Sequence, residues 1–290
     1  MHTINHKDIE ASINPVGAEL SSLKVNGIEY LWQGDEQYWS GRAPILFPIV
    51  GALKNDFMTY QGQRHEMAKH GIARHATFEC MATTPDSVSL RLQADATSLR
   101  QYPWNFELIA HFTLSDSGLA IRYEVINTDE KPMLFTIGSH PAFALNISGP
   151  AELEHYTVTI DQSEPLQRYD LHDSGLLDTQ AKPYGTVIPL SEHIFDHDAL
   201  VFRDISASSI ELSHKGQTML TVDTGGAPHL GIWAKPGAPF VCIEPWLGTC
   251  DFTDSDNQFE NKPDLTTLAP GETYEHGIVI SFPDDERLDH

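Results

Sequence analysis

Three short segments of the sequence place ionisable side chains beside glycine or proline, the residues that shape tight turns. They are residues 69–74 (KHGIAR), 138–143 (GSHPAF) and 244–246 (EPW). His70, His140 and Glu244 are residue types that can exchange protons with a bound molecule. Two histidines and one carboxylate in a common cleft would form a general acid/base set.

Each of these residues also has a purely structural interpretation. A carboxylate after an apolar run is normally exposed, so Glu244 could simply end its strand at the surface. His70 and His140 could be hydrogen-bonded turn residues. The alternative is a cleft on a sheet surface, with flat aromatic walls for a ring-shaped ligand. Such walls could come from Phe143, Trp233 and Trp246. Spacing along the chain leaves both interpretations open.

Strands must position these segments, because apolar residues recur with a period of two and helical periodicity hardly appears. Glycines at Gly118, Gly216 and Gly237 favour hairpin turns within this pattern. The alternating runs include residues 87–95, 106–128, 210–224, 231–246 and 273–282. No strands alternate with amphipathic helices, which argues against a parallel α/β fold and favours an all-β antiparallel sandwich. Short helices are predicted at 96–102 and 190–195.

The chain has 290 residues, and no clear linker or fixed-period repeat divides it. We therefore expect one domain over 1–290, with a solvated acidic tail at 284–290. Asp and Glu number 41 against 18 Lys and Arg, giving a formal net charge of −23. This charge repels phosphate backbones and anionic lipid, so it argues against nucleic-acid and membrane partners. A few arginines could still reverse the field inside one pocket.

The three cysteines, Cys80, Cys242 and Cys250, cannot all pair with one another, and no CxxC spacing occurs. This usage argues against a disulfide framework or a cysteine-based zinc site and suits a reducing cytoplasm. The N-terminus lacks the apolar region of a secretory signal. No run approaches the roughly 18 apolar residues of a membrane-spanning helix. We therefore expect a cytoplasmic protein.

Motifs for nucleotide, serine-hydrolase and metalloprotease chemistry are all absent: there is no GxGxxG, GxxxxGK[ST], GxSxG or HExxH. Residues 251–256 are rich in acids, but they lack the glycine and closing glutamate of a calcium loop and predict a solvated loop. His193 and His197 have helical spacing without a third ligand nearby, which favours a surface or capping role over zinc. The sequence therefore predicts neither a metal nor a cofactor.

Seven segments occur in one order along residues 8–280: 17–32 (GAELSSLKVNGIEYLW), 38–53 (YWSGRAPILFPIVGAL), 69–74 (KHGIAR), 102–108 (YPWNFEL), 138–143 (GSHPAF), 196–202 (DHDALVF) and 241–251 (VCIEPWLGTCD). Together they resemble the aldose 1-epimerase (galactose mutarotase) superfamily, and within it a mutarotase-like branch related to glucose-6-phosphate 1-epimerases. The resemblance implies a single-domain antiparallel β-supersandwich with a few short helices.

The resemblance also implies roles for individual residues. His140 matches the general acid, Glu244 the general base and His70 a second active-site histidine. Arg74 matches an arginine that contacts sugar hydroxyls or a phosphate. The substrate-binding aspartate falls at Asp198, which we favour over Asp196 because the apolar run begins directly after it.

Two further binding residues are suggested at Arg42 and Trp246. Arg42 resembles a pocket arginine of the phosphosugar branch, and Trp246 offers an aromatic surface to a sugar. The chain lacks the Gly-Arg-x-x-Asn-Arg segment of archetypal galactose mutarotases, which argues against galactose itself as the substrate.

The function implied is a cofactor-independent isomerase that interconverts the α and β anomers of an aldose. One alternative is a hexose-6-phosphate 1-epimerase, since Arg42 and Arg74 would permit a phosphate. The net charge of −23 and the lack of an evident lysine cluster favour a neutral sugar. Alternatives from other classes are a non-catalytic carbohydrate-binding or sensing protein and a domain that mediates protein contacts. The expected partner is a small-molecule sugar, and the expected state is a monomer or homodimer.

Overall fold

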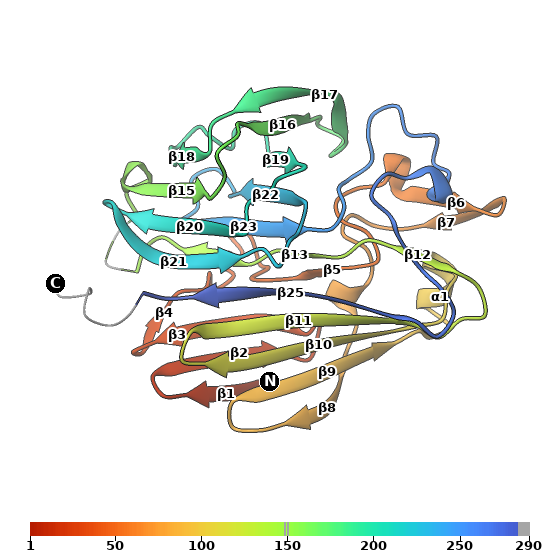
Figure 1. The fold of residues 1–290 in the computed structure, drawn as a ribbon, viewed down its shortest axis with the longest axis horizontal. Coiled ribbons are helices and arrows are strands. Elements are labelled where there is room, and N and C mark those ends of the chain that lie inside the picture. The colour runs from red at the N-terminus through yellow and green to blue at the C-terminus, as the bar shows by residue number, and fades with distance from the viewer. Residues whose placement is uncertain (148, 150, 284–290) are drawn as a thin grey trace.

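Antiparallel β-strands make up nearly all the regular structure of the computed structural model, which describes residues 1–147, 149 and 151–283 (Figure 1). This confirms the all-β fold predicted from the alternating pattern. The predicted acidic tail at 284–290 lies outside the described residues. Within the described ranges, no helix is long and apolar enough to cross a membrane.

The largest sheet has nine strands, and Figure 1 follows it from β18 through the central β25 and β11 to the edge strand β8. In pairing order these are β18 (Val187–Pro189), β15 (Tyr156–Ile160), β20 (Ser209–His214), β21 (Gln217–Asp223), β25 (Thr273–Ser281), β11 (Gly118–Asn127), β10 (Phe106–Ser115), β9 (Ser87–Gln93) and β8 (Glu79–Thr83). Buried and half-exposed residues alternate along β11, so one face packs on the core and the other meets solvent.

A second sheet has eight strands, including one off its main path. In order they are β17 (Leu177–Tyr184), β16 (Leu166–Leu171), β19 (Leu200–Arg203), β22 (His229–Trp233), β23 (Phe240–Trp246), β13 (Gly138–Ser139) and β5 (Ile45–Leu46), with β14 (Ala142–Ala144) paired to β23. All seven residues of β23 are buried. Both faces of this central strand are therefore covered.

Shorter elements complete the chain. A four-stranded sheet contains β1 (His2–His6), β2 (Ile9–Asn14), β3 (Glu19–Val25) and β4 (Ile28–Glu29), and two pairs are formed by β6 (Phe57–Tyr60) with β7 (Gln63–Glu66) and by β12 (Met133–Phe135) with β24 (Thr266–Leu268). The helical elements are α1 (Ser98–Gln101) and 3₁₀ turns at Lys54–Asp56, Ala73–His75, Leu153–His155 and Phe259–Asn261. α1 lies beside the β6–β7 hairpin at one end of the molecule (Figure 1).

Of the two helices predicted from sequence, α1 confirms the first and the second is wrong. Residues 190–195 do not form a helix, and the segment continues as hydrogen-bonded turns. Its backbone bonds join residues three apart, as from the Ile194 N–H to the Ser191 carbonyl at 3.4 Å and from Asp196 to His193 at 3.2 Å. So short a segment gains too few bonds to offset the cost of helix nucleation.

The predicted hairpins are present, and their turn residues explain why. β20 and β21 are joined by Lys215 and Gly216, with φ of 50° and 79°. Two consecutive positive φ values fit a two-residue turn whose twist matches that of the flanking strands. Gly118 begins β11 after the Asp116–Ser117 turn with φ of 128°, and a Cβ there would lie 2.1 Å from the Ile280 carbonyl oxygen. Glycine is required at that point by conformation and by space.

The main hydrophobic cluster takes residues from both large sheets, for example Ile121 of β11 and Ile243 of β23. A smaller cluster includes Val201 of β19 together with Trp246, Leu177 and Cys250. The sheet register pairs Val201 with Gly231, and Gly231 with Glu244. Directly paired residues share a face, so this face of the eight-stranded sheet carries Glu244 and Trp246.

Two glycines let the Trp246 indole lie flat across neighbouring strands. Gly138 pairs with Trp246 from β13, and Gly231 lies diagonally opposite on β22. A Cβ would be 2.6 Å from Trp246 Cδ1 at Gly138 and 2.5 Å from Trp246 Cζ2 at Gly231. Both positions require glycine because a larger residue would have no space: a Cβ less than 3 Å from the indole cannot be accommodated without moving the ring.

Replacement of Gly231 by alanine tests this packing. We expect Gly231→Ala to displace the Trp246 ring and lower the free energy of unfolding by about 1–3 kcal/mol, the usual cost of overpacking. Denaturant unfolding and tryptophan fluorescence measure the two effects. Gly185→Ala is the matched control, because its Cβ would meet only the Val187 carbonyl oxygen at 3.8 Å. Equal stability of the two variants would contradict the steric argument.

Candidate active site

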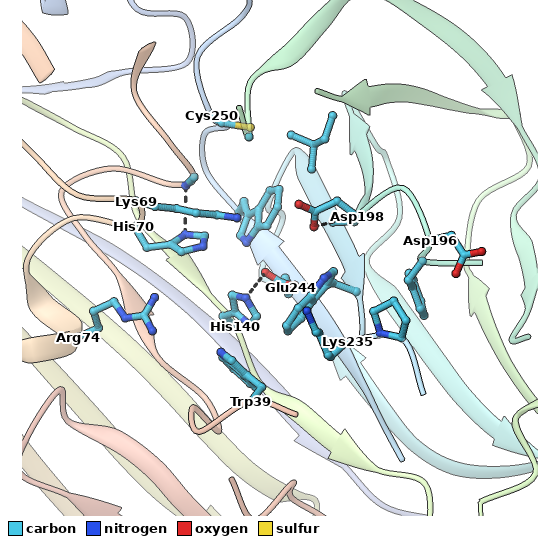
Figure 2. A pocket seen from close by; sticks show the side chains of 18 residues that line it. Trp39, Lys69, His70, Arg74, His140, Asp196, Asp198, Lys235, Glu244 and Cys250 are labelled. Carbon is cyan, nitrogen blue, oxygen red and sulfur yellow. Dashed lines mark hydrogen bonds and ion pairs between the residues drawn. The ribbon is translucent and has the colours of Figure 1, made fainter. Parts of the chain in front are cut away.

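A cavity of about 480 Å³ lies over this face of the eight-stranded sheet. Its size falls within the range of about 300–1,000 Å³ typical of small-molecule sites. All but one of the binding and catalytic residues predicted from sequence line it: His70, Arg74, His140, Asp198, Glu244 and Trp246. The three motifs singled out in the sequence therefore converge on one cavity (Figure 2).

Glu244 and His140 meet at the floor of the cavity. His140 Nε2 lies 3.2 Å from Glu244 Oε2. Glu244 is 1% exposed and His140 7%, so the interpretation of Glu244 as a solvent-facing strand end is wrong. The reason is that β23 continues through Trp246 and is covered on both faces. The carboxylate is thus held within a buried strand.

His140 is fixed from three directions. It follows β13, where the hydroxyls of Ser139 and Tyr123 are 3.0 Å apart and join this turn to the nine-stranded sheet. The Trp39 ring stacks on the imidazole with centroids 5.0 Å apart at 28°. Trp233 meets the same imidazole edge-on at 5.9 Å. These contacts hold the ring in one orientation and keep water from two of its sides.

His70 is held in a defined tautomer by Gly51. The Gly51 N–H donates to His70 Nδ1 at 3.1 Å, and the His70 N–H donates to the Gly51 carbonyl at 2.8 Å. Because Nδ1 accepts, the ring proton of the neutral imidazole is on Nε2. Burial, reinforced by the positive charge of Lys69 and Arg74, lowers the pKa of His70 well below its usual range. His70 therefore supplies a neutral N–H donor.

Burial decides the protonation of the His140–Glu244 pair. It lowers the pKa of His140 to about 3. It also raises the pKa of Glu244 well above its usual range; Lys69 opposes this rise and Asp198 adds to it. These opposite shifts favour a proton on the carboxyl group over one on the imidazole. A buried pair without separated charges avoids most of the desolvation cost.

Both candidate aspartates line the cavity, but their surroundings differ. Asp196 Oδ2 lies 3.0 Å from Nδ1 of His193, which places that histidine in a surface pair. Asp198 has a φ of 71°, and its Oδ1 accepts the N–H of the next residue, Ala199, at 2.8 Å. Figure 2 shows Asp198 on the side of Glu244 and Asp196 farther away from it. Asp198 thus has oxygen lone pairs free to receive a ligand.

Three cationic side chains line the same cavity: Lys69, Arg74 and Lys235. Within the described part of the chain, none of them has a hydrogen-bond or ion-pair partner. Lys69 and Arg74 lie on the His70 side of the cavity and Lys235 on the opposite side (Figure 2). Burial lowers the pKa of Arg74, and Glu19 partly counters this. The sequence indicated no lysine cluster beside Arg74, and in the structure a single lysine, Lys69, lies on its side of the cavity.

Arg42 and Phe143 are the two proposed residues that the structure places elsewhere. Arg42 Nη2 donates to the Gln33 carbonyl at 2.8 Å, and the Arg42 backbone N–H donates to Glu19 Oε1 at 2.8 Å. Arg42 is thus engaged in its own loop, outside the described lining of the cavity. Phe143 is fully buried in the main hydrophobic cluster.

Sequence reasoning missed several lining residues and one supporting ion pair. Trp39 and Lys69 stand in motifs that were recognised, yet nothing in their spacing indicated that they face a cavity. Asp251 was assigned to a solvated loop; instead it is 3% exposed, and its Oδ1 lies 2.9 Å from Lys262 Nζ. Asp251 Oδ2 accepts the Lys54 N–H at 3.0 Å. Asp251 thus joins the segment after β23 both to Lys262 and to the segment that carries Gly51 and Lys54.

One group of three side chains in the described part of the chain has the types and spacing of metal ligands: His140, Cys242 and Glu244. All three cysteines are free, with Cys80 exposed and Cys242 and Cys250 buried. Burial raises the pKa of Cys250, which lines the cavity, to about 11. Its thiol is therefore protonated and poorly nucleophilic at neutral pH.

Comparisons with known proteins bear on the whole chain. The aldose 1-epimerase family profile matches residues 1–281. Protein LacX (plasmid) of Lactococcus lactis subsp. lactis is 31% identical over 293 residues, covering 96% of this chain and 98% of that protein. A galactose mutarotase related enzyme from Lactobacillus acidophilus is 31% identical, with a TM-score of 0.93 over 97% of each chain. A galactose mutarotase-like protein from Lactobacillus casei is 28% identical, with a TM-score of 0.91 over 98% of this chain and 100% of that one.

The pKa of His140 can be measured directly by NMR of its ring nitrogens. We expect the ring to stay neutral as the pH falls from about 7 to about 4, because its pKa is near 3, whereas an unperturbed histidine titrates near 6.5. Loss of the signal in His140→Asn assigns it. A titration near pH 6.5 in the folded protein would contradict the burial argument.

Proposed function

Because the chain belongs to the aldose 1-epimerase family, we propose that it is an isomerase that interconverts the α and β anomers of an aldose by acid/base ring opening and closure. Family membership supplies the reaction class. The observation that carries the assignment of residues is the buried contact of 3.2 Å between His140 Nε2 and Glu244 Oε2. A matched proton donor and acceptor on a sugar-sized cavity is what this reaction requires.

The reaction moves two protons. A pyranose opens when the anomeric hydroxyl, O1, loses a proton and the ring oxygen, O5, gains one. In the proposed resting state the pair shares one proton, carried by Glu244, and the 3.2 Å contact lets it pass to His140 Nε2. Glu244 then accepts the O1 proton while His140 donates to O5. Rotation about the C1–C2 bond and the reverse transfers close the ring as the other anomer, so the pair returns to its starting state.

Other lining residues orient the sugar in this proposal. The Nε2–H of His70 donates to the ring-oxygen region and stabilises charge that develops there. Asp198 accepts from sugar hydroxyls, and the Arg74 guanidinium donates to oxygens as a rigid fork. Trp246 and Trp39 provide flat apolar walls for the ring carbons. Arg42 has no part in this arrangement.

Substitution of each member of the pair tests the mechanism. We expect Glu244→Gln and His140→Asn each to reduce catalysed anomer exchange by at least about 100-fold, the lower end for a positioned acid or base. Exchange NMR on an equilibrium mixture of anomers measures the rate above the uncatalysed background. His193→Asn is the control, because His193 pairs with Asp196 at the surface. A wild-type rate in either folded variant would remove that residue from the mechanism.

A wild-type protein that binds sugar without accelerating exchange would instead favour the non-catalytic carbohydrate-binding alternative. Binding alone needs no matched acid and base, so Glu244→Gln and His140→Asn would then retain their affinity for the sugar. Neither the variants nor the wild-type protein would accelerate anomer exchange. Titration of wild type and Glu244→Gln with glucose by calorimetry distinguishes this outcome from a failure of the acid/base assignment.

A specific observation favours a second candidate, a hexose-6-phosphate 1-epimerase. Lys69 and Arg74 lie on one side of the cavity without partners among the described residues. Two cations without ion-pair partners suit an anionic group on the sugar. The net charge of −23 opposes an anion only at a distance, because surface charge is screened beyond about 8 Å at physiological ionic strength.

Salt dependence separates a neutral from a phosphorylated substrate. We expect the KM for glucose 6-phosphate to rise with salt, and Lys69→Met and Arg74→Met to lose the preference for phosphate over free glucose. Exposed charge attraction is screened by salt, whereas neutral hydroxyl contacts are affected little. Lys235→Met is the control on the opposite side of the cavity. The neutral aldose would be favoured instead if the KM for glucose 6-phosphate did not change with salt and the protein showed no preference for glucose 6-phosphate over glucose.

A further inference from the structure

Cys242 lies beneath the proposed catalytic pair, and the proton transfers make no use of it. Side chains alternate along a strand, so Cys242 and Glu244 of β23 point to the same face. Their partners on β22 are Trp233 and Gly231. Each of His140, Cys242 and Glu244 offers a ligand atom, and these atoms all lie within 4.8 Å of one another. An imidazole, a thiol and a carboxyl group are thus gathered at one point.

This donor set matches the preference of a soft or borderline divalent cation. Zinc is bound by cysteine sulfur, histidine nitrogen and carboxylate oxygen, and three protein ligands with one open position are a recurring arrangement. Thiolate selects such ions over magnesium or calcium. A thiolate and a carboxylate together also neutralise a dication, which matters because all three side chains are buried.

We propose that His140, Cys242 and Glu244 form an inhibitory binding site for a soft divalent cation such as Zn²⁺. The ion takes the imidazole and the carboxylate that the proposed epimerase reaction needs, and the fourth position faces the cavity. Binding releases the thiol proton and the carboxyl proton to solvent and changes no oxidation state. The inhibition readout rests on the proposed function, whereas the metal binding itself does not.

Two features limit the affinity and make inhibition reversible. Lys69 and Arg74 line the same cavity without partners among the described residues and repel a cation. The ion must also displace protons that burial holds on Cys242 and Glu244, since burial raises the pKa of both. A chelator should therefore remove the metal and restore the protein.

Cysteine substitution combined with Zn²⁺ titration tests the site. We expect Zn²⁺ to inhibit anomer exchange by the wild-type protein and EDTA to restore the rate. Cys242→Ser should need at least roughly tenfold more Zn²⁺ for the same inhibition, since loss of even an indirect partner costs a metal site that much. Cys250→Ser is the matched control: Cys250 is also buried and lines the cavity, yet it lies outside the donor group. Equal sensitivity of Cys242→Ser and wild type would overturn the proposal.

Cobalt binding gives a readout that needs no catalytic activity. We expect Co²⁺ added to the wild-type protein to produce a thiolate-to-cobalt charge-transfer band, which Cys250→Ser retains and Cys242→Ser loses. Cys242→Ala serves as a second variant if the serine form does not fold, as judged by its thermal unfolding. A wild-type protein that shows no such band would overturn the metal site. A band without any catalysed exchange would leave the site standing and contradict the proposed function instead.

Discussion

Burial of the Glu244 carboxyl group in the centre of a sheet is the constraint on which the rest of the site depends. An isolated buried carboxylate would be costly, and Glu244 is 1% exposed. The fold reduces this cost by placing His140 Nε2 at 3.2 Å and by favouring a single shared proton. The same arrangement makes the pair reactive, because a proton that either group can hold is one that a ligand can take up or release.

The rest of the architecture keeps this pair close together and partly dry. Gly138 and Gly231 give Trp246 room to lie flat beside Glu244. The Tyr123–Ser139 hydroxyl pair links the His140 turn to the opposite sheet. Stability and site geometry are therefore coupled: these contacts fill space in the sandwich and also fix a functional side chain. In a β-sandwich with long-range pairing, such positions need rigid support from several strands at once.

The alternating pattern was sufficient to predict strands such as β9, β11 and β25, because buried and more exposed residues alternate along them. Turn chemistry located the hairpins, as at Lys215–Gly216. The burial of Glu244 was not predictable, since it depends on which strands flank β23 and on what covers both faces. The Asp251–Lys262 pair was missed for a similar reason. Asp251 is anchored by the Lys54 N–H, 197 residues away in sequence, and an acidic stretch alone looks solvated.

The net charge of the sequence likewise does not predict which charged groups a ligand meets in the cavity. The charges of the whole sequence sum to −23, and this net charge describes the electrostatic field that a distant polyanion meets. A ligand inside the cavity meets individual groups instead. There burial favours the protonated form of Glu244, Asp196 has a histidine partner, and Lys69 and Arg74 have no hydrogen-bond or ion-pair partner among the described residues. Because screening and desolvation make electrostatics local, the identity and pairing of these few groups outweigh the total. What the cavity binds is therefore a property of the side chains that the fold leaves uncompensated.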